Sequence, residues 1–156
     1  MSLERRSDDY YGIAYLKRAR GKKSLTLNLK HEEGRQIFRR LATNADVVVE
    51  NFRPGVAQRL GVDYGALRRE NPRLVYCSLT GYGATGPDRD LKAYDLMVQA
   101  AAGLMGISGE PDAAPMKAGS ALSDCIAGAY SALGIVAALH ERHKSGAGQA
   151  IDVSMT

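Results

Sequence analysis

The sequence is poor in cysteine. Its two cysteines, Cys77 and Cys125, lie in apolar surroundings and predict small core residues in a reducing compartment, not a disulfide framework or a metal site. Residues 1–6 contain no apolar signal segment, which favours a cytoplasmic protein. The longest apolar stretch, 122–139, is rich in Ala, Gly and Ser, so we expect no membrane span and no membrane partner.

Charge is distributed unevenly along the chain. Residues 1–40 hold eleven Lys and Arg against five Asp and Glu, whereas the whole chain has a formal net charge of +4. A basic start is suited to nucleic acid, to a phosphorylated cofactor, or only to solvent. No DNA- or RNA-binding motif accompanies the basic start, so we expect no nucleic-acid partner.

The order of apolar patterns predicts the fold class. Segments 24–28, 46–50, 74–79 and 149–154 have strand patterns, and segments 31–44, 54–60, 63–70, 94–104 and 119–143 have helix patterns. Strands that alternate with helices predict an α/β fold with a doubly wound, mostly parallel, Rossmann-like sheet. We expect residues 1–20 to form an irregular basic lead-in to one α/β domain. That domain, in residues 21–156, is expected to be incomplete because an apolar first strand and a closing element are missing.

The helix pattern at 119–143 is the most apolar, and Asp124 is the one formal charge between residues 122 and 139. Ser120 or Ser123 is expected to cap its start. Two interpretations of Asp124 stay open from the residues alone. It is either a first-turn acid, stabilised by the helix N-terminus by up to about 1 kcal/mol, or an anionic nucleophile for an acyl carbon. Apolar residues at three- and four-residue spacing predict a helix packed on most of its surface: Leu122, Ile126, Ala129, Leu133, Val136 and Leu139.

Two further motifs are weak evidence for a binding site, one for a dinucleotide and one for a metal. Gly81-Tyr-Gly-Ala-Thr-Gly86 matches a dinucleotide-binding pattern, but 87–90 follow it in place of a helix start, so we do not expect Rossmann-type nucleotide binding. His140 and His143 share a helix face but lack a third ligand, so we expect exposed charges at a helix end and no metal.

A series of ordered motifs resembles one family. Ala45-Asp-Val-Val-Val-Glu-Asn-Phe-Arg-Pro-Gly55 is similar to the family III CoA-transferases of the formyl-CoA transferase type, which also include the carnitine CoA-transferase type. The resemblance covers about residues 18–156. Its further motifs are 20–30, 59–61, 71–78, Gly81-Tyr-Gly83 with Gly86-Pro87, Tyr94-Asp95, 103–105, 109–111, Asp124 and 146–154. Members of that family are substantially longer, so the resemblance implies a partial chain.

By this resemblance Asp124 aligns with the family's catalytic aspartate. The implied activity is transfer of coenzyme A between an acyl-CoA and a free carboxylic acid through aspartyl anhydride and aspartyl-CoA thioester intermediates. Asp95 is expected to help position the reacting groups. The positions that match CoA contacts are Leu27, Lys30, Asn51, Phe52, Arg59, Lys92 and Tyr94. Their basic members suit phosphates and their apolar members suit adenine or pantetheine, although each basic residue alone is commonly a solvated charge.

The resemblance leaves alternatives. Acyl-CoA racemases share the fold but use a histidine just before the Asp95 position, where this chain has Tyr94, and tyrosine is a poor base at neutral pH. A non-catalytic CoA-binding or assembly module is the alternative from another class. Because the family forms interlocked homodimers, the resemblance implies a homodimer for the parent enzyme. We expect the 156 residues alone not to turn over substrate.

Overall fold

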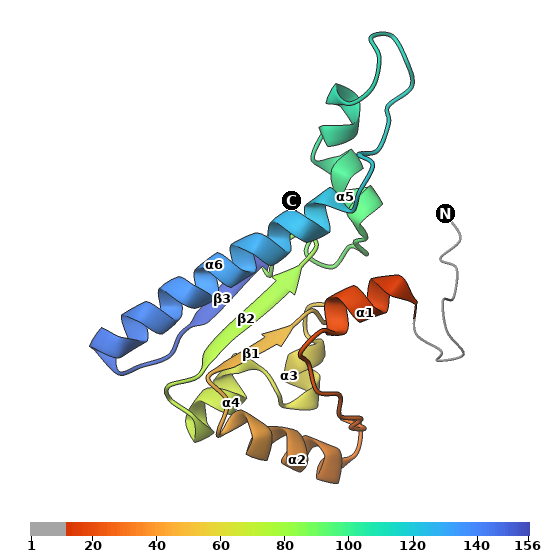
Figure 1. Ribbon diagram of the computed structural model, residues 1–156. Coiled ribbons are helices and arrows are strands. Elements are labelled where there is room, and N and C mark those ends of the chain that lie inside the picture. Colours follow the sequence, from red (N-terminus) through yellow and green to blue (C-terminus); the bar gives the residue numbers. More distant parts are fainter. Residues whose placement is uncertain (1–11) are drawn as a thin grey trace.

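The computed structural model describes residues 12–156, and it contains a parallel sheet (Figure 1). The strands are β1 (Val47–Glu50), β2 (Val75–Thr80) and β3 (Ala150–Ser154), in the order β1-β2-β3. β1 pairs with β2 in parallel and so does β3, with Val48 opposite Tyr76 and Cys77 opposite Ile151. The predicted α/β fold with a parallel sheet is therefore confirmed.

The helices follow the predicted order, with one additional helix, α1 (Ile13–Ala19), in the described part of the lead-in 1–20 that was predicted to be irregular. Segment 24–28 has no regular secondary structure and pairs with no strand in the described residues, so the strand predicted there is wrong. Alternating side chains make a strand only where a neighbour takes the backbone hydrogen bonds. Residues 1–11 of the predicted irregular lead-in lie outside the described residues. The helices are α1 (Ile13–Ala19), α2 (Glu32–Ala42), α3 (Val56–Leu60), α4 (Tyr64–Glu70), α5 (Asp95–Ala101), the 3₁₀ turn η1 (Leu104–Ile107) and α6 (Leu122–Ser145).

Helices cover both faces of the sheet. Successive strand residues point to opposite faces. Tyr76 meets Tyr64 of α4, with ring centroids 6.1 Å apart, whereas its neighbour Cys77 lies beside Ser131 of α6. Figure 1 shows α6 running along β2 and β3, with α5 and η1 extending beyond the sheet at its start. The start of α6 therefore lies at the same end of the sheet as the last residues of the strands.

α6 packs through its small residues, so the predicted packing on most of its surface is wrong. Its buried positions are Ser123, Ala127, Ser131, Ala138 and Arg142. Small side chains let the helix backbone approach the sheet closely, and a Cβ on Gly134 would lie 3.2 Å from the Ile151 side chain. The larger apolar side chains point outward instead: Ile126 is 47% exposed, Tyr130 64%, Leu133 64% and Val136 65%.

By length and composition α6 is apolar enough to cross a membrane, which corrects the expectation that no stretch of the chain is. This property alone does not identify a span, because core helices of domains share it. Part of α6 is in contact with β2 and β3.

The far end of α6 is anchored by Arg142, whose side chain is buried. Its guanidinium donates to Asp46 Oδ1 at 2.7 Å and to the Arg73 carbonyl at 3.0 Å. These contacts join the helix to the segments that precede β1 and β2. Cys77 is buried as predicted, but Cys125 is exposed, because it lies on the outer side of the first turns of α6.

Candidate active site

The carboxyl ends of all three strands open into a cleft of about 380 Å³. Asn51 and Phe52 directly follow β1, Gly81 follows β2, and Met155 follows β3. Ligands of open α/β sheets bind at this edge of the sheet. We call this space the Asp124 cleft. Its lining includes Asn51, Phe52, Lys92, Tyr94, Asp95 and Asp124.

The wall of the Asp124 cleft depends on a close approach at Gly81. A Cβ on Gly81 would lie 1.9 Å from the Cβ of Ala93, so only glycine allows the loop of residues 82–94 to return over the end of β2. That return brings Lys92 and Tyr94 into the same cleft as Asn51 and Phe52. The glycine-rich segment thus serves a close chain crossing, and the next helix, α5, starts only at Asp95, as the sequence predicted.

The end of β1 is held by side chains. Asn51 donates through Nδ2 to the Leu79 carbonyl at 2.5 Å, which ties it to β2. Glu50 accepts the backbone N–H of Phe52 at 2.7 Å, and this bond turns the chain after the strand. These bonds hold the Asn51 side chain and the Phe52 backbone.

Asp124 lies in the first turn of α6 with an exposed side chain. The residue that caps this helix is Ala121, whose methyl group accepts no hydrogen bond, so the predicted caps Ser120 and Ser123 are wrong. The acceptor comes from another helix. Asp95 Oδ1 accepts the N–H of Ser123 at 2.8 Å and that of Asp124 at 3.3 Å. The amides expected to hold the Asp124 carboxylate are thus occupied by Asp95.

Basic side chains line the same cleft as the carboxylates of Asp95 and Asp124. Lys92, Arg53 and Arg89 line the Asp124 cleft, and Arg89 also contacts the Asp90 carboxylate at 3.3 Å. Lysine and arginine at a cleft mouth are donors for phosphate oxygens. The cleft therefore combines a carboxylate at a helix start with cations able to hold a phosphorylated ligand.

Three of the residues that the resemblance singled out lie elsewhere in the described chain. Leu27 and Lys30 belong to the segment before α2, and Arg59 lies on α3 with an exposed side chain. The structure brings the other five together with Asp95 in the Asp124 cleft.

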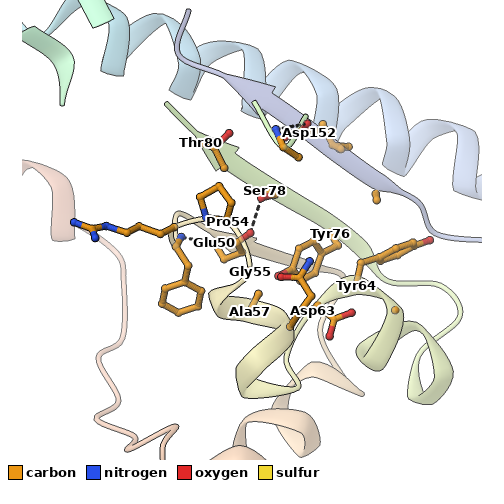
Figure 2. Close-up of a pocket in the computed structure, with 17 residues that line it drawn as sticks. Glu50, Pro54, Gly55, Ala57, Asp63, Tyr64, Tyr76, Ser78, Thr80 and Asp152 are labelled. Carbon is orange, nitrogen blue, oxygen red and sulfur yellow. Dashed lines mark hydrogen bonds between the residues drawn. The ribbon is translucent and has the colours of Figure 1, made fainter. Parts of the chain in front are cut away.

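A second cavity, of about 320 Å³, adjoins the first and shares Phe52, Arg53, Pro54 and Thr80 with it. In Figure 2 the Ser78 hydroxyl points to Glu50, to which it donates at 2.5 Å. Burial raises the pKa of the Tyr76 hydroxyl, with smaller contributions from the Glu50 and Asp63 charges, so Tyr76 stays neutral. The sequence analysis did not predict a role for Glu50, Tyr76 or Ser78. Polar side chains within otherwise apolar strands could have indicated them.

Among residues 12–156, no group of three or more His, Cys, Asp or Glu lies close enough to hold a metal ion. His140 and His143 are exposed near the end of α6, far along the helix from Asp124.

Comparisons with known proteins agree on one family. The model of CoA-transferase family III matches residues 2–156. A succinate–glutarate CoA-transferase of Agrobacterium fabrum is 49% identical over 136 residues, 87% of this chain and 34% of that protein. An acetyl-CoA:oxalate CoA-transferase of Acetobacter aceti is 49% identical over 137 residues, 87% of this chain and 35% of that protein.

Solved structures give the same result for the fold. A crystal structure of a CAIB/BAIF family protein from Brucella suis superposes with a TM-score of 0.84 at 46% sequence identity, covering 86% of this chain and 36% of that one. The chain thus spans about a third of the length of the proteins it matches.

Proposed function

Because this chain belongs to CoA-transferase family III, we propose that the whole protein transfers coenzyme A from an acyl-CoA thioester to a free carboxylic acid. The observation that carries the proposal is the Asp124 cleft. An exposed carboxylate at a helix start shares one space with Lys92, Asn51 and Phe52. Such a carboxylate can act as a nucleophile toward an acyl carbon.

The proposed reaction begins when an Asp124 oxygen attacks the thioester carbonyl. The carbon–sulfur bond breaks, CoA leaves as a thiolate, and a mixed anhydride forms. The thiolate then attacks the aspartyl carbonyl, releasing the donor acid and leaving an aspartyl-CoA thioester. The acceptor carboxylate displaces CoA to give a second anhydride. Attack of the thiolate on the acceptor's carbonyl yields the new acyl-CoA and regenerates the Asp124 carboxylate, with no net change in protons.

The other cleft residues are assigned to binding. We assign Lys92, which lines the cleft, to a phosphate of CoA as a point charge, and the exposed Phe52 to apolar contact with the ligand. Asn51, fixed by the Leu79 carbonyl, and Tyr94 offer polar groups to the pantetheine arm. Leu27, Lys30 and Arg59 remain proposed CoA contacts from outside the cleft, acting on more distant parts of the ligand.

Transfer is favoured over racemisation by the cleft composition. None of the described residues that line it is a histidine, and Tyr94 stands beside Asp95. Racemisation needs a base that exchanges protons near neutral pH, for which histidine is suited and tyrosine is not.

We further propose that the whole protein is a cytoplasmic homodimer.

The test uses the full-length protein that contains this chain. Exchange of CoA between an acyl-CoA and a free acid is measured for the wild type, Asp124→Asn, and Glu141→Gln at the other end of α6 as a matched control. We expect exchange in the wild type and control and its loss in Asp124→Asn. Calorimetry showing CoA binding without exchange in the wild type would instead support a non-catalytic module. Retained turnover by Asp124→Asn would refute the role of Asp124.

A further inference from the structure

Gln99 is a fully buried polar residue of α5, with 0% of its surface exposed. Its Nε2 donates to Asp95 Oδ2 at 2.6 Å and to the Ser120 carbonyl at 3.3 Å. Its Oε1 accepts the N–H of Ala118 at 2.9 Å. One amide therefore joins α5 to the segment that leads into α6.

The two oxygens of the Asp95 carboxylate have different partners. Oδ2 of Asp95 is held by Gln99, which leaves Oδ1 directed at the N–H groups of Ser123 and Asp124. Asp95 thus supplies the acceptor that the first turn of α6 lacks in its own sequence. The amides of this turn are thus bonded to Asp95, and the exposed Asp124 side chain lines the Asp124 cleft.

We propose that Gln99 is a positioning residue of this site, which acts through Asp95 to fix the first turn of α6 and the direction of the Asp124 carboxylate. This inference rests on the proposed function. A glutamine in a dry position costs free energy unless all its polar groups are bonded, and here its three bonds all serve the segments around Asp124. An apolar side chain of similar length would fill the volume equally well but would leave Asp95 free to turn.

The test compares Gln99→Met, which keeps the volume and removes the hydrogen bonds, with Gln36→Met on the exposed face of α2. Both are made in the full-length protein. Since a misplacement of about 1 Å can cost on the order of a hundredfold in rate, we expect kcat of Gln99→Met to fall about ten- to a hundredfold. KM for the acyl-CoA should stay within about twofold, and Gln36→Met should match the wild type. A wild-type kcat in Gln99→Met, or a KM raised as much as kcat falls, would overturn the inference.

A swapped pair supplies a rescue and covers a failure of Gln99→Met to fold. Gln99→Glu places two carboxylates side by side and should lose activity. Adding Asp95→Asn restores a donor and an acceptor between the two positions and keeps an oxygen for the α6 amides. We expect the double variant to exceed Gln99→Glu at least tenfold in kcat. Equal activity in the two would overturn the inference.

Amide hydrogen exchange of residues 121–126 gives a readout that does not depend on turnover. Loss of the Gln99 hydrogen bonds should speed exchange in this first turn, with no change in Gln36→Met. If the wild type transfers CoA but amide hydrogen exchange in Gln99→Met is the same as in the wild type, only the positioning role of Gln99 is wrong. If the wild type shows no transfer, the proposed function is wrong, and the exchange measurement still decides whether Gln99 holds the turn.

Discussion

The Asp95 carboxylate accepts the backbone N–H of Ser123 at 2.8 Å, although the two residues are 28 positions apart in the sequence. This bond caps α6 from the neighbouring helix α5. Isolated helix starts leave several N–H groups without partners, and an outside carboxylate satisfies them as a side-chain cap would. The residue proposed as nucleophile, Asp124, follows directly in the same turn, so the geometry of the Asp124 cleft depends on this contact.

Loss of the Asp95 cap should destabilise the chain. Since Asp95→Ala removes the acceptor for Ser123 and Asp124, we expect the free energy of unfolding to fall by about 1–2 kcal/mol, the usual cost of losing a helix cap. Asp95→Asn keeps an oxygen there and should lose less. Urea denaturation measures both, with exposed Asp88→Ala as the control. Equal stability of Asp95→Ala and Asp88→Ala would contradict the capping role.

Arg142 should matter more to stability than its charged neighbours in the last turn of α6. Arg142→Met removes charge-assisted hydrogen bonds to Asp46 and to the Arg73 carbonyl, which are worth about 1.5–3 kcal/mol for a charged donor. The exposed Lys144→Met should change the free energy of unfolding by less than about 0.5 kcal/mol. Thermal and urea denaturation measure both variants. An equal loss in the free energy of unfolding of Arg142→Met and Lys144→Met would contradict the anchoring role of Arg142.

The stability of the chain should decrease at alkaline pH through Cys77. Burial raises the pKa of the Cys77 thiol, with the nearby Ser131 hydroxyl acting in the opposite direction. The folded thiol therefore keeps its proton where the unfolded thiol, with a pKa near about 8.5, has lost it. Stability is full below that pH and falls as pH rises above it, by at most about 1.4 kcal/mol per pH unit.

Urea denaturation from about pH 7 to about pH 11 measures this slope. Cys77→Ala should flatten the part of the slope that begins near about pH 8.5, whereas exposed Cys125→Ala should leave it unchanged. Burial also raises the pKa of Tyr76, so a further fall is expected above about pH 10 in all three proteins. Identical slopes in Cys77→Ala and the wild type would contradict the role of Cys77.

Lys92 should contribute to CoA affinity in the full-length protein. Because Lys92 lines the Asp124 cleft as a point charge, we expect Lys92→Ala to weaken CoA binding about tenfold, equal to about 1.4 kcal/mol. The difference should shrink as salt is raised, since the side chain is exposed and its charge is screened. Calorimetry with CoA measures it. Lys144→Ala, far along α6, should bind as the wild type does, and a matching loss there would point to net charge alone.

Much of the fold was predictable because its signals are local. The structure has β1, β2, α3 and α4 close to the segments predicted for them, which were 46–50, 74–79, 54–60 and 63–70. Segment 24–28 was predicted wrongly, because its alternation of side chains contains no information about a pairing partner. The spacing of large apolar residues predicted the helix α6 correctly, but it did not predict which face of that helix packs on the sheet.

The candidate site was predictable only in part. The resemblance named Asn51, Phe52, Lys92, Tyr94 and Asp124, and the structure gathers them in one cleft. Gln99 was missed because its hydrogen bonds reach residues 19 and 21 positions further along the chain, and nothing in the local pattern of α5 marks a buried amide.

The most direct test of the account is to trap the intermediate on Asp124. The full-length protein is incubated with an acyl-CoA, treated with hydroxylamine, and analysed by intact mass and peptide mapping. The account predicts a modified peptide whose changed residue is Asp124, and no such product in Asp124→Asn. CoA exchange that proceeds while Asp124 stays unmodified, or modification found at Asp95 instead, would contradict it.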